Sequence, residues 1–594
     1  MGATPLAKSP IIPNASRAIF FAVVCLLFIR FLPPTGWIVD NHVSFFLTSR
    51  VYPIEVFEDR IRSVQPLQSS IFLNSLAKQR PDDLNYQLAV VDHFGDQPAI
   101  AGKQMTEVIS HMTQLLQRFP NSPAIIAAIV GRSSQGNLLE IRPQYSKEVN
   151  RSFNHEPPID LPEEVRIRRQ FHIANVLKYS EMGIRIDPEN AYFHLARAAA
   201  LFGISEDTLA LTEFSNAAKC TIYDDYIGAL NDGEYRLINT IYPHTSVLNA
   251  AASTSSIVYG HYALFSKACD IALFIAKECE RLGVVENGIR IRRDILKIGA
   301  LLRDKSTTYY GVVVGSRICW KSVLINRPLV LVPDQILNTS EERLARNEVR
   351  LAEFLRRTGH SDLTAEFKNQ FDQCRKSETF IRNLRADLPI SSIAANVLPY
   401  WYLGTALLLA IGMATVIILL FMLSSALVNK LSPTKRWVHP LITWSLFVIC
   451  ATASSLCIAL DGINPLDLLK SDEYAHSVGE HLMQSLTGDV SIFFKHGVIN
   501  LAGGFVCATF VFVLVRTIIG PRGLPVSQRL VAHSGRAFST ILIALTVLYV
   551  GIVFRTNQVE PECINQLHKA SINELKYVAE RNHLIWPVGQ EISK

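Results

Sequence analysis

The sequence predicts a mainly α-helical protein that combines a transmembrane helix bundle with a large helical-repeat-like domain outside the cytoplasm. Three observations lead to this prediction. Long apolar segments stand near the N-terminus and in the last third of the 594-residue chain. The stretch between them carries apolar residues at helical spacing. With 19% charged residues and a mean hydropathy of +0.20, the chain is too apolar for an ordinary soluble enzyme and too charged to be membrane-embedded throughout.

Five apolar segments define the predicted membrane part. They cover residues 18–29, 400–428, 437–460, 496–515 and 537–554. The last four are long enough to cross about 30 Å of hydrocarbon. The first is short and ends at Arg30, so it is either an uncleaved anchor or a secretory signal peptide. We interpret it as an anchor, because no Ala-x-Ala cleavage site follows it.

The basic residues of the short loops predict the topology, since Lys and Arg are retained on the cytoplasmic side. The two basic loops hold Lys430, Lys435 and Arg436, and Arg522, Arg529 and Arg536. A cytoplasmic N-terminus then follows, with the large domain and the C-terminus extracytoplasmic. The predicted parts are an anchor (1–39), an extracytoplasmic helical domain (40–395), a four-helix transmembrane domain (396–556) and an extracytoplasmic tail helix (557–594).

Within the large domain, start and stop signals delimit several helices. Residues 257–282 form one, closed by Gly283. A capping-box spacing of Thr339 and Glu342 opens another that ends at Gly359. The next begins near Asp362 and runs to residue 384. Successive helices of this kind favour antiparallel pairs.

One such pair resembles a tetratricopeptide repeat over about residues 180–220, with a weaker likeness over 86–130. The resemblance rests on small and large apolar residues at the spacing of that family: Ala198, Leu201, Ala210, Phe214 and Ala217. It departs from the family pattern at His194 and Arg197, where a large aromatic residue and a leucine are common. The resemblance implies stacked helix pairs and a surface that binds protein partners.

Small residues recur every four positions in the predicted spans and allow close helix packing. They are Ala406, Ala410, Ala414, Gly504 and Ala508. This packing is expected within the bundle, with a partner subunit as the alternative. The spans hold one strongly polar residue away from their edges, Asn500. Ion-coupled transporters usually place ionisable residues at this depth.

Candidate chemistry is sparse. His476, Glu480 and His481 miss the spacing of inverted zinc proteases by one residue, so a solvated loop is expected there. A basic face on one helix is expected to be solvated or lipid-facing, and otherwise to bind an acidic partner: Arg290, Arg292, Arg293, Lys297 and Arg303. The ten cysteines contain no Cys-x-x-Cys pair. One or two disulfides could form in an oxidising compartment, but spacing does not fix their connectivity.

No sequence motif indicates nucleotide binding or hydrolysis, and we assign no catalytic residue, metal or cofactor. The predicted function is that of an integral membrane scaffold, not an enzyme, whose outer domain binds other proteins within a membrane complex. Its expected contacts are protein partners and the lipid bilayer, not nucleic acid. The alternatives are a subunit of a channel, transporter or secretion assembly, and a membrane-bound enzyme of unrecognised type.

Overall fold

The fold is known from a computed structural model. It describes residues 11–33, 35–48, 66–96, 103–134, 138–139, 163–241, 260–323, 341–384, 389–430, 445, 490–519 and 526–581. These residues form nineteen α-helices and no strand, so the mainly α prediction is confirmed for this part of the chain. They fall into two compact units. We call them the apolar unit (Met1–Val56, His244–Ala252 and Ile390–Leu567) and the array unit (Phe57–Pro243, Ser253–Pro389 and His568–Lys594).

The apolar unit contains four helices that are long and apolar enough to cross a membrane. They are α1 (Ile11–Phe31), α20 (Pro389–Lys430), α23 (Val490–Ile519) and α24 (Val526–Ile572, whose last residues belong to the array unit). A shorter helix, α2 (Gly36–Thr48), follows α1 after a break at Thr35. Four of the five predicted spans therefore coincide with such helices. Of the fifth, 437–460, only residue 445 is described.

Arg30, which ends the first apolar segment, forms an ion pair with Asp40 of α2. The chain turns between the two residues, and the hydroxyl of Thr35 donates to the carbonyl of Ile29 over 2.7 Å. The first helix therefore ends at Phe31, directly after Arg30, and does not run on to Trp37. The charge that interrupts the apolar run has a partner within the same unit.

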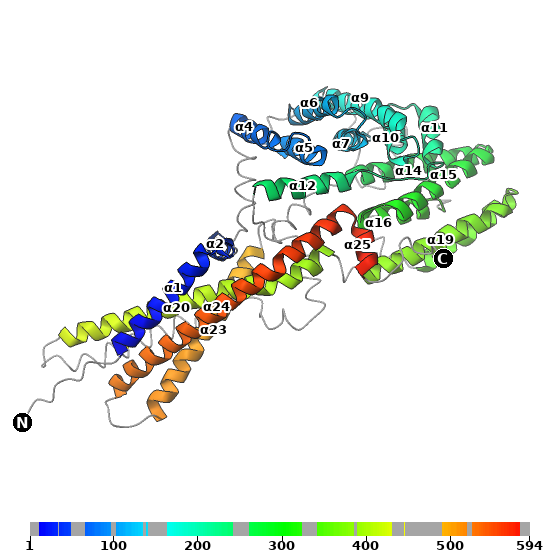
Figure 1. Ribbon diagram of the computed structural model, residues 1–594. Helices are drawn as coiled ribbons and strands as arrows, with labels where there is room; N and C mark the ends of the chain where they lie inside the picture. Colours follow the sequence, from blue (N-terminus) through cyan, green and yellow to red (C-terminus); the bar gives the residue numbers. More distant parts are fainter. Residues whose placement is uncertain are drawn as a thin grey trace, which may run out of the picture. The chain divides into compact units, whose positions relative to one another are not determined.

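In the array unit, most helices pack against the next helix along the chain (Figure 1). The first group comprises α4 (Pro66–Ala77), α5 (Leu84–Asp92), α6 (Lys103–Arg118), α7 (Pro123–Ser134), α9 (Glu163–Ile186), α10 (Ala191–Gly203) and α11 (Asp207–Ala217). The second comprises α14 (Gly260–Arg281), α15 (Val285–Lys305), α16 (Tyr309–Lys321), α18 (Glu341–Arg357) and α19 (Thr364–Leu384). Between them, α12 (Ile227–Ile241) packs along α5 instead of a sequence neighbour. A last short helix is α25 (Glu574–Arg581).

Two helices end at the glycines that the sequence predicted as their stops. Gly283 and Gly359 have φ angles of +81° and +83°, which favour glycine. At the end of α14, the Val284 N–H donates to the Cys279 carbonyl over 2.8 Å, the long hydrogen bond of a Schellman motif. Both predicted helix stops are confirmed. Thr339, the predicted start signal of α18, lies outside the described residues.

The C-terminal tail differs in detail from the prediction. Instead of a separate helix after residue 557, α24 continues to Ile572 with Pro561 inside it. Residues 557–572 are thus the end of the same helix that begins at Val526. Helix α25 then follows after Asn573.

Candidate functional site

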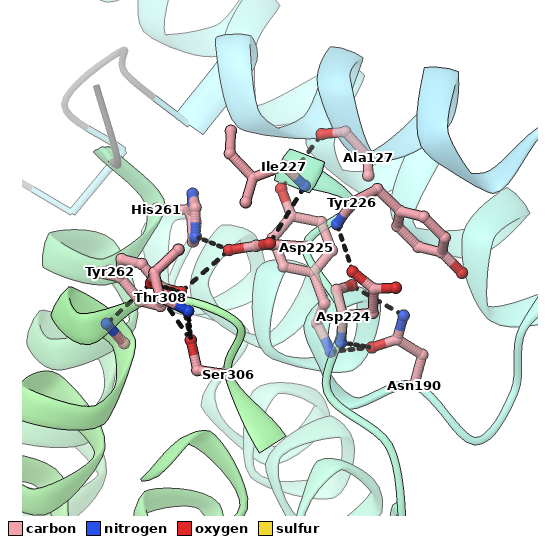
Figure 2. Close-up of polar contacts among 12 residues, drawn as sticks. Ala127, Asn190, Asp224, Asp225, Tyr226, Ile227, His261, Tyr262, Ser306 and Thr308 are labelled. Carbon is pink, nitrogen blue, oxygen red and sulfur yellow. Dashed lines mark hydrogen bonds and ion pairs between the residues drawn. The ribbon is translucent and has the colours of Figure 1, made fainter. Parts of the chain in front are cut away.

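The array unit contains a buried polar cluster where the N-terminal ends of α10, α12 and α14 meet the start of α16 (Figure 2). Asn190 supplies one half of it. Its side-chain oxygen accepts hydrogen bonds from the backbone N–H groups of Tyr192 and Asp224, both at 3.1 Å. Its side-chain nitrogen donates to the carboxylate of Asp187 and to the Asp224 carbonyl. Asn190 therefore caps α10 and holds the loop before α12 at the same time.

Asp225 supplies the other half. Its Oδ2 lies 3.0 Å from His261 Nε2 and accepts a hydrogen bond from the Tyr262 hydroxyl over 3.0 Å. Its Oδ1 accepts from the Ile227 N–H over 3.2 Å, which caps α12. Figure 2 shows the carboxylate between these groups. One buried carboxylate thus joins the start of α12 to the start of α14.

The Tyr262 hydroxyl extends this network to the α15–α16 turn. It lies 3.0 Å from the Ser306 hydroxyl and 3.2 Å from that of Thr308. Thr308 in turn accepts a hydrogen bond from the Gly311 N–H and caps α16. The starts of three helices, α12, α14 and α16, are therefore tied together by Asp225, Tyr262 and Thr308.

A His–Asp pair beside hydroxyl groups is the residue set of general acid–base chemistry. Here the groups are enclosed, because Tyr262 has no exposed surface and His261 and Asp225 are at most 9% exposed. Burial alone would raise the pKa of Asp225. Hydrogen bonds from His261, the Ile227 N–H and Tyr262 outweigh burial and leave the pKa below its usual value. The cluster holds an ionised carboxylate in the core, and its hydrogen bonds position the starts of α12 and α14.

Tyr226 shows how firmly this junction is held. It has a φ of +57°, a left-handed conformation that is unfavourable for a bulky residue. Its N–H donates to the Asp224 carboxylate over 2.7 Å, and its hydroxyl donates to Asp187 over 2.7 Å. These two hydrogen bonds fix the backbone that presents Asp225.

A second buried polar cluster lies in the apolar unit. His42 on α2 is fully buried, and its Nδ1 lies 3.1 Å from the Tyr549 hydroxyl of α24. The ring meets the edge of Trp401 on α20 and lies against Gly404, where a Cβ would clash with it. Trp401 donates its indole N–H to Glu560 over 3.1 Å, and Glu560 is fully buried. Sequence reasoning missed this cluster, because its members lie on three helices and His42 is outside the predicted spans.

The prediction that the basic residues of α15 form a solvated or lipid-facing surface is wrong for two of the five. Arg292 and Arg303 are fully buried. Arg292 forms a bidentate ion pair with Glu280 and donates to the Ser322 carbonyl over 2.8 Å. Arg303 pairs with Asp304. The α15 helix is packed between α14 and α16, so the residues of its basic pattern face different neighbours.

The remaining members of that face are partly paired. Arg293 binds Glu366 of α19 over 2.8 Å, and Arg290 donates to Ser215 of α11 over 2.9 Å. Lys297 is exposed. This face is therefore a set of links between helices more than a continuous binding surface.

All five residues of the repeat-like pair are buried: Ala198, Leu201, Ala210, Phe214 and Ala217. They lie on α10 and α11, which pack against each other. The two departures from the family pattern, His194 and Arg197, both contact Glu213 of α11, at 2.8 and 3.2 Å. Polar links thus replace part of the apolar contact between these helices.

The small residues of the spans separate into two groups. Ala406, Ala410 and Ala414 have no exposed surface. Ala508 is exposed, and a Cβ at Gly504 would meet no atom within 4 Å among the described residues. Only the alanine stripe of α20 is thus packed against its surroundings within this part of the chain.

Several candidate residues lie outside the described residues: His476, Glu480 and His481. The side chain of Asn500 is likewise not described. Among the described residues, no group of three His, Cys, Asp or Glu side chains is placed to hold a metal ion.

Comparison with known proteins finds no relative. No protein-family model matches the chain. No curated protein and no solved structure matches it either.

Proposed function

We propose that the protein is an integral membrane scaffold whose array unit binds other proteins in a membrane complex. The observation that carries this proposal is the combination of membrane-length apolar helices with a separate unit of serially packed helices. Serial packing of helix pairs creates extended surfaces, which such proteins commonly use to bind partners. The buried polar cluster around Asp225 supports the proposal, because it ties helices of the array unit together from within its core.

The sequence separation of one contact supports a repeat-like architecture similar to tetratricopeptide repeats. Asn190 and Asp224 are 34 residues apart and are joined by two hydrogen bonds. That separation equals the length of a tetratricopeptide repeat. Asn190 directly precedes α10, and Asp224 lies three residues before the start of α12. Helix α9 departs from the pattern, since its 24 residues form one uninterrupted helix.

The proposal includes a topology. About five spans cross the membrane, the N-terminus is cytoplasmic, and the array unit is extracytoplasmic. The basic residues around Lys435 and those at the start of α24, Arg529 and Arg536, support this orientation.

Site-specific photocrosslinking in native membranes tests the scaffold function. A photoreactive residue replaces Leu209 on α11 or Ile167 on α9, which are 55% and 56% exposed. Phe20 on α1, 71% exposed in an apolar helix, is the control position for lipid contact. We expect the same one or two protein adducts from the array positions and none from Phe20. The Asp225→Ala background, which destabilises the junction, should reduce these adducts.

The result that would overturn the proposal is also clear. If neither array position yields a protein adduct while the protein is intact in the membrane, the array unit does not present a binding surface there. Adducts that persist unchanged in the Asp225→Ala background would show contact that does not depend on this junction.

A second candidate function is a subunit of a channel, transporter or secretion assembly, and the His42 cluster favours it. Ionisable residues buried among membrane helices often mark pathways for ions or protons. His42 Nε2 has no hydrogen-bond partner among the described residues. Loss of substrate flux across the membrane in the His42→Phe variant would favour this function, provided that the crosslinks of the array unit are retained. Retained flux in His42→Phe and Glu560→Gln would count against it.

A further inference from the structure

Helices α23 and α24 of the apolar unit form a hairpin. Helix α23 ends at Ile519 and α24 begins at Val526, so six residues connect them. The rings of Phe510 on α23 and Phe538 on α24 meet edge to face, with 4.9 Å between their centroids. The two helices therefore run antiparallel next to their connection, and we call this end of the hairpin its connected end.

The ring contact shows that three arginines share the connected end. Arg516 lies six residues beyond Phe510, a rise of about 9 Å along α23. On α24, Arg529 and Arg536 lie nine and two residues before Phe538, or about 14 and 3 Å. Along the axis of the hairpin, Arg516 thus falls between the other two, and the three guanidinium groups belong to one layer.

On both helices, an exposed arginine stands at the end of an exposed apolar stripe. Arg536 shares a face of α24 with Ile543 and Val547, seven and eleven residues further on, which are 40% and 56% exposed. Arg516 shares a face of α23 with Phe512, four residues earlier, which is 60% exposed. A phospholipid has the same order of groups, with a phosphate at one end and acyl chains below it.

The positive charge of the connected end has no acidic residue near it in sequence. Residues 490–559 contain no Asp or Glu. In the part of the apolar unit that the structure describes, the acidic residues are Asp40, Glu560 and Glu562. Asp40 pairs with Arg30. Glu560 lies 24 residues beyond Arg536, about 36 Å along α24. The acidic and basic groups of this helix therefore stand at opposite ends of its apolar part.

We propose that the connected end of the α23–α24 hairpin binds the phosphate headgroups of anionic phospholipids, with the acyl chains along the two apolar stripes. Guanidinium groups match phosphate with two parallel hydrogen bonds, and arginines near a membrane surface attract anionic lipids. The stripes favour a lipid over an acidic protein, because they continue from the arginines along the membrane-length helices. The inference rests on the membrane insertion included in the proposed function, but not on the binding of protein partners.

The test uses the purified full-length protein in nanodiscs that contain equal amounts of phosphatidylcholine and phosphatidylglycerol. Native mass spectrometry counts the lipids of each class that stay bound when the protein is released. We expect phosphatidylglycerol to be retained in preference to phosphatidylcholine. The double variant Arg516→Gln/Arg536→Gln should reduce this preference by about tenfold or more, because each arginine near a membrane surface contributes about fivefold.

Matched variants separate charge from packing and from position. Arg516→Lys/Arg536→Lys keeps both charges and should keep most of the preference. Arg555→Gln removes an exposed arginine 19 residues beyond Arg536 on the same helix and should leave the preference unchanged. Equal retention of the two lipids by the unmodified protein would overturn the proposal, and so would an equal loss in Arg555→Gln. Either result leaves the membrane insertion intact, since the protein is still held in the nanodisc.

Photocrosslinking in native membranes distinguishes a lipid from an acidic protein at the same surface. A photoreactive residue replaces Ile519, which is 78% exposed and lies three residues beyond Arg516. We expect phospholipid adducts at this position, and fewer of them in the Arg516→Gln/Arg536→Gln background. Adducts to a protein instead of to lipid would overturn the proposal and assign the arginines to an acidic partner.

Discussion

At the scale of single residues, Asp225 is the group on which most of the junction depends. It accepts hydrogen bonds from His261, Tyr262 and the Ile227 N–H in a site where its own side chain and those of His261 and Tyr262 are buried. Removing the acceptor leaves buried donors without partners, each of which destabilises the fold by about 1–3 kcal/mol. The junction therefore depends on one carboxylate.

We expect Asp225→Ala to lower the free energy of unfolding of the array unit by about 3 kcal/mol. Thermal unfolding of the detergent-solubilised protein measures the change. The control is Asp82→Ala, at a carboxylate whose side chain is 95% exposed and which pairs with Arg118 on the surface. Equal midpoints for the two variants would contradict the role of Asp225.

His172 on α9 makes stability depend on pH. The side chain is 3% exposed, and burial together with Arg168 lowers its pKa below the usual 6.5. In the unfolded chain, His172 is protonated as the pH falls through about 6.5. In the folded protein, the same side chain stays neutral until a lower pH. The contribution of neutral His172 is complete above about pH 6.5 and is lost as the pH falls towards the folded-state pKa.

We expect the unfolding midpoint to fall between pH 7.5 and pH 5.5, and His172→Gln to remove part of that fall. Arg168→Gln should weaken the dependence as well, because the repulsion that lowers the pKa is gone. Midpoints measured across this range by scanning fluorimetry provide the test. An unchanged slope in both variants would assign the pH dependence to other groups.

At the scale of the elements, α15 and α16 pack unusually closely through Gly299 and Gly315. A Cβ added at Gly315 would lie 2.7 Å from the Gly299 carbonyl oxygen and also clash with the Arg303 backbone. Alanine normally stabilises a helix relative to glycine. Here the clash outweighs that preference, since backbone atoms cannot yield.

Gly315→Ala should therefore destabilise the array unit by about 1–3 kcal/mol. Gly131→Ala on α7 is the matched control, because its Cβ would make an ordinary 3.5 Å contact with the Tyr192 hydroxyl. That substitution should be neutral or stabilise by up to about 1 kcal/mol. Chemical denaturation of both variants decides whether close backbone contact holds this helix pair together.

At the scale of the whole molecule, the proposed orientation can be tested with the existing cysteines. Cys279 on α14 is partly exposed, whereas Cys269, Cys319 and Cys374 are buried. If the array unit is extracytoplasmic, a membrane-impermeant maleimide should label Cys279 on intact cells. Cys220 should label slowly, because burial and nearby carboxylates raise its pKa to about 11.

The control for this labelling is Cys279→Ser, which should remove the fast component. Labelling that appears only after the membrane is permeabilised would reverse the proposed orientation. The scaffold proposal would then require partners on the cytoplasmic side.

Local signals account for how well the helices could be predicted. The stops at Gly283 and Gly359 depend on backbone conformations that favour glycine, and the long apolar runs depend on hydropathy alone. The buried clusters have no such signal. His42, Trp401, Tyr549 and Glu560 are far apart in the chain, and none of them stands in a motif.

The sequence by itself determined the helical class, four of the apolar helices and the bounds of several others, because these follow from neighbours along the chain. Tertiary structure decided which polar residues are buried. From the sequence, Arg292 and Arg303 look like part of a solvated basic face, yet both are buried. Arg292 binds Glu280 of α14 and the carbonyl of Ser322 at the end of α16. Arg303 binds Gln370 of α19. Burial depends on contacts between distant segments, and helical periodicity on one segment does not contain that information.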